Sequence, residues 1–141
     1  MVVKQLSIFL ENKQGKFTEV AHILGDAGIN MTAFSIADNS DFGILRLIVS
    51  EPEKAFNILR EKKFGVTLTD VVCLLCPNTP GSLAKALDIL NKENIFIEYM
   101  YAFAMNNGAY VIIRAKNIED CAKALQKHKL ELIAADDLYK F

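Results

Sequence analysis

Apolar residues in the first half of the chain recur with two different periods. In the stretch 2–10, Leu6, Ile8 and Leu10 fall on every second position, which is typical of a strand with one face in a core. After a polar loop, apolar residues follow the i, i+3, i+4, i+7 spacing of an amphipathic helix, at Phe17, Val20, Ala21 and Leu24. The pattern therefore predicts a strand, a loop and a helix.

The rest of the first half adds two strands, a helix and a long strand. Gly25 or Gly28 ends the first helix, and Gly28 suits the position just after the helix end. Glu51-Pro52-Glu53 opens a second helix, because proline is favoured in the first turn and acids at the positive end of the dipole. We place the end of that helix near Phe64-Gly65. The other predicted elements are strands at 29–38, 42–50 and 66–76, with a turn at Asn39-Ser40-Asp41.

The second half repeats this order at an offset of 66 residues. The helical stripe returns at the same four offsets, as Leu83, Ala86, Leu87 and Leu90. Asn106-Asn107-Gly108 joins a predicted hairpin of strands 95–105 and 109–115, with Asn-Gly as the favoured two-residue turn. A helix carrying Ile118, Cys121, Ala124 and Leu125 follows, and a strand at 130–138 closes the unit.

Each half thus has the order βαββαβ, the split-βαβ motif of ferredoxin-like folds. The predicted class is α+β, with two tandem units at 1–70 and 71–141, each an antiparallel sheet with both helices on one face. Units of this size bury little surface alone. A 52% hydrophobic share and largely apolar strand faces therefore predict further association, as a homodimer.

Charge and hydropathy exclude several classes of function. Sixteen basic and 17 acidic residues leave a formal charge of −1, without the basic footprint of a nucleic-acid-binding protein. Tyr99, Tyr101 and Phe103 could serve as an RNA-stacking face, but the chain lacks the associated basic signature. No apolar stretch approaches membrane-spanning length and no signal sequence is evident, so we expect a cytoplasmic protein with no membrane or nucleic-acid partner.

Titratable side chains offer no catalytic or metal-binding arrangement. Cys73 and Cys76 form a CxxC within a predicted strand, where they point to opposite faces, so together with Cys121 they are expected to be buried and reduced. His22 is expected to face solvent and His128 to lie at a helix end. Asp136-Asp137 lies beside the last predicted strand with no cleft. We expect no enzyme, cofactor or metal.

Two short loops carry the remaining candidate chemistry. Asn12-Lys13-Gln14-Gly15-Lys16-Phe17 and Asn78-Thr79-Pro80-Gly81-Ser82-Leu83 each lead from a strand into a helix. Unpaired first-turn amides at the positive end of a helix dipole favour a carboxylate, and a glycine lets the ligand approach the backbone. An alternative is ordinary turn and cap chemistry, with Thr79 or Asn78 as N-cap and Pro80 at N1.

Both loops resemble those of the ACT domain family, small-molecule sensors found in many enzymes of amino-acid metabolism. The resemblance covers the whole chain as two copies. It rests on the two loops and on the segments Gly28-Ile29-Asn30-Met31 and Asn94-Ile95-Phe96-Ile97. The Asn-x-Pro-Gly-x-Leu form of the second loop is the nearer match.

The resemblance implies an effector site at the seam between two domains, where a glycine loop faces a second strand. Asn12 and Asn30 match positions that hold the effector, whereas the second unit keeps Asn78 but has Phe96 in place of Asn30. This difference predicts either two unequal sites, or one working site with the other seam purely structural. Lys16 could favour an anionic effector, or could simply be solvated.

Two functions remain open at this point. The first is a freestanding, non-catalytic regulatory protein that binds a free amino acid, or a similar small carboxylate, and signals to an enzyme of amino-acid metabolism. The second is a structural or regulatory subunit that associates with such an enzyme and binds no metabolite.

Overall fold

A computed structural model describes residues 1–38 and 41–141. The predicted turn at Asn39-Ser40-Asp41 has its first two residues outside this range. The chain forms two compact units, each of which takes a short segment from the opposite end of the sequence. The N-terminal unit consists of Lys4–Thr69 and Leu138–Phe141, and the C-terminal unit of Met1–Val3 and Asp70–Asp137.

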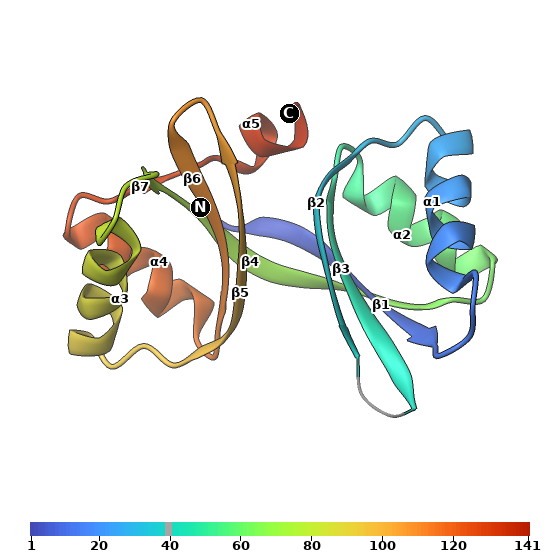
Figure 1. Ribbon diagram of the computed structural model, residues 1–141, viewed down its shortest axis with the longest axis horizontal. Helices are drawn as coiled ribbons and strands as arrows, with labels where there is room; N and C mark the ends of the chain where they lie inside the picture. Colours follow the sequence, from blue (N-terminus) through green and yellow to red (C-terminus); the bar gives the residue numbers. More distant parts are fainter. Residues whose placement is uncertain (39–40) are drawn as a thin grey trace. The chain divides into compact units, whose positions relative to one another are not determined.

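The N-terminal unit has the predicted βαββαβ order (Figure 1). Its strands lie in the order β2-β3-β1-β4, and β3 pairs antiparallel with both of its neighbours. Both helices pack on the same face of the sheet, where Leu6, Leu24 and Leu59 are fully buried in one core. The elements are β1 (Val3–Glu11), α1 (Lys16–Asp26), β2 (Met31–Asp38), β3 (Phe42–Val49), α2 (Pro52–Glu61) and the first part of β4 (Gly65–Pro77).

The C-terminal unit repeats the arrangement with the second part of β4 as its first strand. β6 lies between β5 and β4, and β7 pairs with β4 on the other side. Leu74, Leu90 and Leu125 are fully buried in its core. The remaining elements are α3 (Ser82–Lys92), β5 (Ile97–Met105), β6 (Gly108–Ala115), α4 (Ile118–Lys127), β7 (Glu131–Leu132) and α5 (Ala135–Tyr139). The predicted tandem ferredoxin-like fold is confirmed.

Helices α1 to α4 end in the same way. After each one, a residue in the left-handed region turns the chain, and the next residue donates its N–H to a carbonyl five residues back, which is the Schellman pattern. The left-handed residues are Gly28 (φ 73°), Lys63 (φ 67°), Asn94 (φ 58°) and Lys129 (φ 59°). Each is followed by an apolar residue packed against the core, namely Ile29, Phe64, Ile95 and Leu130.

The hairpin of the C-terminal unit turns one residue earlier than predicted. Met105 pairs with Gly108, so the two central residues are Asn106 and Asn107, with φ of 52° and 65°. Two positive φ values are what a type I′ turn requires, and asparagine tolerates them. Gly108 is not one of the two central residues of the turn. A glycine is needed there for space, because an added Cβ would lie 2.8 Å from the Leu75 side chain.

The predicted closing strand at 130–138 is wrong. β7 has only two residues, and the chain then forms the short helix α5. Asp136 and Asp137 lie in the first turn of that helix, where the exposed amides favour negative charge. Leu138 follows as a fully buried residue, and from there the chain belongs to the N-terminal unit.

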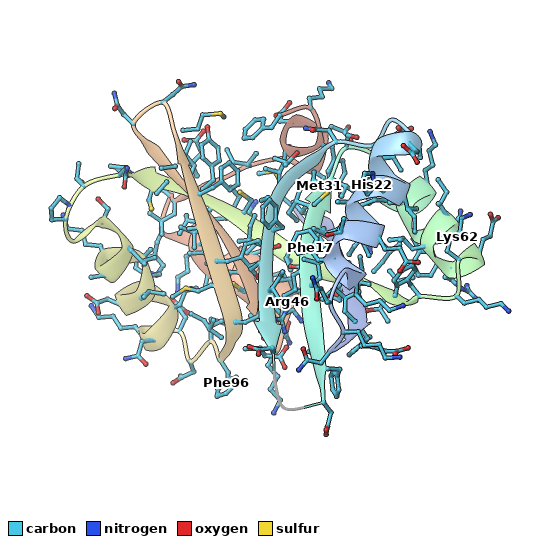
Figure 2. The ribbon with its side chains drawn as sticks, turned by 45° about the vertical axis from the view of Figure 1, so that its right-hand side comes forward. Phe17, His22, Met31, Arg46, Lys62 and Phe96 are labelled. Carbon is cyan, nitrogen blue, oxygen red and sulfur yellow. The ribbon has the colours of Figure 1, made fainter. Side chains whose placement is uncertain are left out.

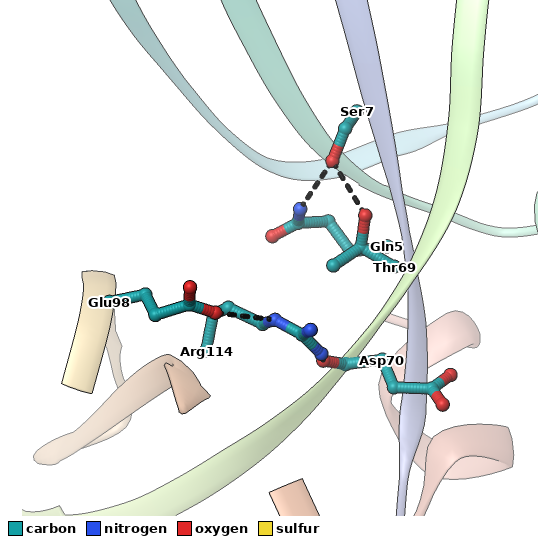
Figure 3. A network of polar contacts seen from close by, with 6 residues as sticks. All are labelled: Gln5, Ser7, Thr69, Asp70, Glu98 and Arg114. Carbon is teal, nitrogen blue, oxygen red and sulfur yellow. Dashed lines mark hydrogen bonds and ion pairs between the residues drawn. The ribbon is translucent and has the colours of Figure 1, made fainter. Parts of the chain in front are cut away.

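Polar residues are buried on the sheet face opposite the helices of the N-terminal unit. Gln5 is 0% and Ser7 8% exposed. Gln5 Nε2 donates to Ser7 Oγ at 3.0 Å, and Ser7 Oγ lies 2.9 Å from Thr69 Oγ1 (Figure 3). In the C-terminal unit, the guanidinium of Arg114 donates to Glu98 and to the carbonyl of Asp70 (Figure 3). These bonds offset the cost of removing polar groups from water.

Candidate functional site

The first glycine loop joins β1 to α1 and is open to solvent. Asn12, Gln14 and Gly15 are exposed, and Gly15 occupies the N-cap position with a φ of 88°. A Cβ built on Gly15 would have no atom within 4 Å. No side chain caps the helix, so the first-turn amides of Phe17 and Thr18 have no intrahelical acceptor. The loop therefore presents backbone donors and free space at the same point.

The second glycine loop repeats this geometry. Gly81 is the N-cap of α3 with a φ of 86°, and it too has nothing within 4 Å of a built Cβ. The alternative with Asn78 or Thr79 as N-cap and Pro80 at N1 is wrong. The helix begins at Ser82, so Pro80 lies before the N-cap residue, and no side chain makes a cap bond. Thr79 Oγ1 instead lies 2.7 Å from Ser82 Oγ.

Lys16 is not a freely solvated side chain. Its Nζ lies 3.6 Å from Glu19 Oε2 and 6.0 Å from the centre of the Phe64 ring. Lys16 also lines a cavity of about 180 Å³, together with Phe9 and Lys62. Lys62 is labelled in Figure 2. Glu11 borders the same cavity, and its pKa lies below the usual value because Lys13 donates to it at 2.9 Å. Charges of both signs thus surround the start of α1.

Asn30 and Met31 lie at the other end of α1 from the glycine loop. In Figure 2, Phe17 lies near the start of the helix, and Met31 is seen at the level of His22, further along it. An 11-residue helix is about 16 Å long, so Asn12 and Asn30 of one unit cannot touch one small ligand. Asn30 is also engaged: its backbone N–H donates to Ser50 Oγ at 3.0 Å, and its Nδ2 donates to the carbonyl of Phe141 at 3.2 Å.

Phe96 and Ile97 hold the equivalent place in the C-terminal unit. Phe96 is 68% exposed, and its carbonyl accepts from the Lys116 N–H at 2.9 Å. Ile97, at the start of β5, packs against the core. The Asn30 carbonyl accepts in the same way from the Ser50 N–H at 3.0 Å. The two units therefore share this backbone bond but differ in the side chain at this position.

The sequence pattern missed one residue beside the first glycine loop. The Phe34 ring on β2 meets the Phe17 ring edge-on, with centroids 5.8 Å apart, while Phe34 remains 54% exposed. The repeat offers a signal that could have found it, since the positions 66 residues later are Leu83 and Met100. Both of these are also exposed apolar side chains.

Within residues 1–38 and 41–141, no cluster of three or more His, Cys, Asp or Glu side chains could hold a metal ion. The three cysteines are buried and free, as predicted, and burial raises the pKa of Cys73 to about 12 and of Cys121 to about 11. His22 is exposed. His128 lies 3.0 Å from Glu93 Oε1, and this contact, with Lys127, lowers the pKa of Glu93.

In the described part of the chain, helices are all too short or too polar to cross a lipid bilayer. No functionally curated protein matches the sequence. Among solved structures, protein BT0572 from Bacteroides thetaiotaomicron is 55% identical, with a TM-score of 0.96 over 100% of this chain and 98% of that one.

More distant structures share the fold. The regulatory subunit of aspartate kinase from Thermus thermophilus is 17% identical, with a TM-score of 0.64 over 90% of this chain and 96% of that one. The equivalent subunit from Thermus flavus is also 17% identical, with a TM-score of 0.59 over 90% and 94%. The profile of the ACT domain pair family matches residues 1–141. The chain therefore belongs to the ACT domain pair family.

Proposed function

We propose that this protein is a non-catalytic regulatory protein that binds a free amino acid, or a similar small carboxylate, at its glycine loops. One observation carries the proposal: Gly15 and Gly81 share the same left-handed N-cap geometry, and both face open space. A duplicated turn with uncapped amides offers hydrogen-bond donors to a carboxylate.

The chemistry of the first loop suits a zwitterion. The carboxylate would accept from the Phe17 and Thr18 amides, while the exposed Asn12 amide oxygen accepts from the ammonium group. Asn78 provides the same group at the second loop. Because Asn30 lies at the far end of α1, contact with both Asn12 and an Asn30-type residue requires a second ACT domain against the loop, and we extend the proposal to a homodimer.

Regulation would follow by population shift. A ligand that is bound more tightly in one arrangement of the domains favours that arrangement, by no more than its difference in affinity for the two states. Regulatory subunits of aspartate kinase from two Thermus species share this fold. This similarity supports the idea that the signal passes to a partner enzyme of amino-acid metabolism.

The exposed edge of the N-terminal unit favours a second candidate, a subunit that associates with an enzyme and binds no metabolite. β2 is the edge strand of the sheet, and Phe34 and Ile36 on it are 54% and 51% exposed. Exposed apolar side chains on an edge strand are typical of a surface that another chain covers.

Thermal unfolding against a panel of the twenty free L-amino acids separates the two candidates. A ligand present at 100 times its dissociation constant adds about 2.7 kcal/mol of stability and raises the melting temperature. No shift with any member of the panel would favour the subunit. Calorimetry with the responding amino acid should then show two unequal sites per chain, whereas two identical, independent sites would contradict the Asn30/Phe96 asymmetry.

A further inference from the structure

A cavity of the N-terminal unit gathers lysines from two different helices. Its volume is about 180 Å³, and we name it the lysine cavity because Lys16, Lys62 and Lys63 all line it. Lys16 is the first residue of α1, whereas Lys62 and Lys63 follow the end of α2. The other lining residues are Phe9, Glu11, Glu19, Phe64 and Gly65. Drug-sized ligands need cavities of about 300–1,000 Å³, so this one suits a single small group.

The two carboxylates of the wall already have cationic partners. Glu11 Oε2 lies 2.9 Å from Lys13 Nζ, and Glu19 Oε2 lies 3.6 Å from Lys16 Nζ. Lys13 is not a lining residue, so Glu11 is balanced without using any lysine of the cavity. The carboxylates therefore leave most of the positive charge of the wall in place.

Lys62 and Lys63 carry that remaining charge. Within residues 1–38 and 41–141, neither side chain forms an ion pair with a carboxylate. The two lysines are neighbours in the sequence, so their like charges repel each other. An anion in the cavity would offset this repulsion, and the adjacent Phe9 and Phe64 rings would reduce its screening by water.

The C-terminal unit lacks this arrangement. At an offset of 66 residues, the positions of Lys16, Lys62, Lys63 and Gly65 are taken by Ser82, His128, Lys129 and Glu131. Only one of the three lysines thus recurs, and His128 is engaged by Glu93 Oε1 at 3.0 Å. Glu131 adds a negative charge where the N-terminal unit has a glycine. The excess of positive charge is therefore a property of the N-terminal unit and not of the repeated fold.

We propose that the lysine cavity binds a small dianion of the phosphate class. The inference goes beyond the proposed function and does not depend on it, because it uses the side chains of the cavity and not the amides of the glycine loop. Lysine ammonium groups bind phosphate as point charges. Three of them around one small cavity favour a compact dianion over an extended dicarboxylate, whose two charges lie apart.

NMR titration of the full chain with inorganic phosphate tests the site, at a mildly alkaline pH where phosphate is mainly a dianion. Ionic strength is kept constant with sodium chloride, because salt screens attraction between exposed charges. The backbone amides of Lys16, Lys62, Lys63 and Gly65 should shift along one saturable curve. The run 127–129 is an internal control, since it also places lysines at the end of a helix, and its amides should shift much less.

Two variants remove the charge balance of the lysine cavity. The double change Lys62→Gln and Lys63→Gln should weaken phosphate binding about ten-fold or more. Gly65→Glu keeps all three lysines but introduces the residue that the C-terminal unit has at this position, and it should weaken binding to a similar extent.

The matched control is the double change Lys127→Gln and Lys129→Gln. It removes the same charge from the equivalent helix end of the C-terminal unit, so the dissociation constant for phosphate should stay within about two-fold. The amide spectrum of each variant shows whether it keeps the fold.

Succinate and acetate, titrated at the same ionic strength, complete the test. Phosphate should bind about five-fold more tightly than either, which supports a compact dianion site. The proposal is overturned by equal or tighter binding of succinate or acetate, by an equal response of the run 127–129, or by the absence of a saturable shift. Unchanged affinity in the cavity variants also overturns it. None of these results bears on amino-acid binding, which depends on the amides of the glycine loops.

Discussion

The two units of this protein share a backbone and differ in the chemistry that it presents. The left-handed turns recur at equivalent places, with φ of 88° and 86° at Gly15 and Gly81, and 67° and 59° at Lys63 and Lys129. Lysine has no intrinsic preference for this region. Its presence at both positions shows that the Schellman bonds and the packed apolar residue after them outweigh the local strain.

Side chains at equivalent positions of the two units differ. Asn30 is bonded to Phe141, whereas its equivalent Phe96 is largely exposed. Ala27 is the C-cap of α1, whereas Glu93 is the C-cap of α3 and binds Lys127 and His128. Duplicated turns are kept because the fold depends on them, while exposed side chains are free to take up different partners.

The largest expected effect tests the equivalence of the two cores. Leu59 and Leu125 hold matching positions on α2 and α4, and both are fully buried. Leu59→Ala and Leu125→Ala should each lower the free energy of unfolding by about 2–5 kcal/mol, because each leaves a cavity. Urea denaturation followed by circular dichroism gives the values. A loss below about 1 kcal/mol in only one variant would show that the cores are not equivalent.

Substitution at the glycine loops tests whether both serve as ligand sites. Gly15→Asp and Gly81→Asp place a carboxylate where the ligand carboxylate should lie, so each should reduce affinity at its own loop about 100-fold or more, equal to about 2.7 kcal/mol. Gly15→Ala and Gly81→Ala are the controls, since they add the left-handed strain of about 1–2 kcal/mol without the charge. Affinity retained in both Asp variants, by calorimetry, rules out these loops.

The first turns of α2 and α4 differ in how they are capped, and the difference is expected to be worth about 1 kcal/mol. Asn117 caps α4 by accepting from the Asp120 N–H at 3.0 Å, whereas its equivalent Glu51 makes no cap bond to α2. Asn117→Ala should therefore destabilise the C-terminal unit by about 1 kcal/mol. Glu51→Ala should cost less, because Glu51 makes no cap bond and contributes only its charge at the helix start and a 3.8 Å ion pair with Lys54. Amide exchange in each helix measures both. Equal losses would contradict the assigned caps.

The smallest expected effect is a pH dependence at Glu93 in the C-terminal unit. Hydrogen bonds from His128 and Lys127 lower the pKa of Glu93 from an ordinary value of 4.5. Because the folded-state pKa is depressed, the stabilisation is present above the ordinary value and is lost as the pH falls through the lowered one. NMR titration should place the midpoint of Glu93 below 4.5, and Lys127→Ala with His128→Ala should raise it. An unchanged midpoint would contradict the ion pair.

Periodicity predicted most of the elements because amphipathic strands and helices carry their burial pattern in sequence. The ranges of β1, α1 and α4 follow the apolar stripes, and Gly28 takes the left-handed position just after α1, as expected. The prediction failed where burial is not local. Leu138 looks like the end of a strand, yet it is buried in the N-terminal unit after a helical turn. No local pattern could have revealed a partner surface in the other half of the chain.

The candidate site shows the same division. Both glycine loops were predicted, because a repeated Asn-x-x-Gly before an amphipathic helix is visible in one dimension. The contact of Phe34 with Phe17 was not predicted, because it joins two separate elements through ring packing. The hydrogen bond between Asn30 and Phe141 was not predicted either, because the two residues lie 111 positions apart.

The amino-acid sequence by itself determined the duplication, the βαββαβ order and the two open glycine turns, because these depend on periodicity and backbone preferences that act over a few residues. Only the tertiary structure decided that each terminal segment packs in the unit formed by the other half of the sequence. It also decided that the Asn30 side chain donates a hydrogen bond to the main-chain oxygen of Phe141. Those contacts depend on which surfaces meet after folding. Hydrogen-bond partners so far apart in sequence are selected by the packed core and not by any local pattern.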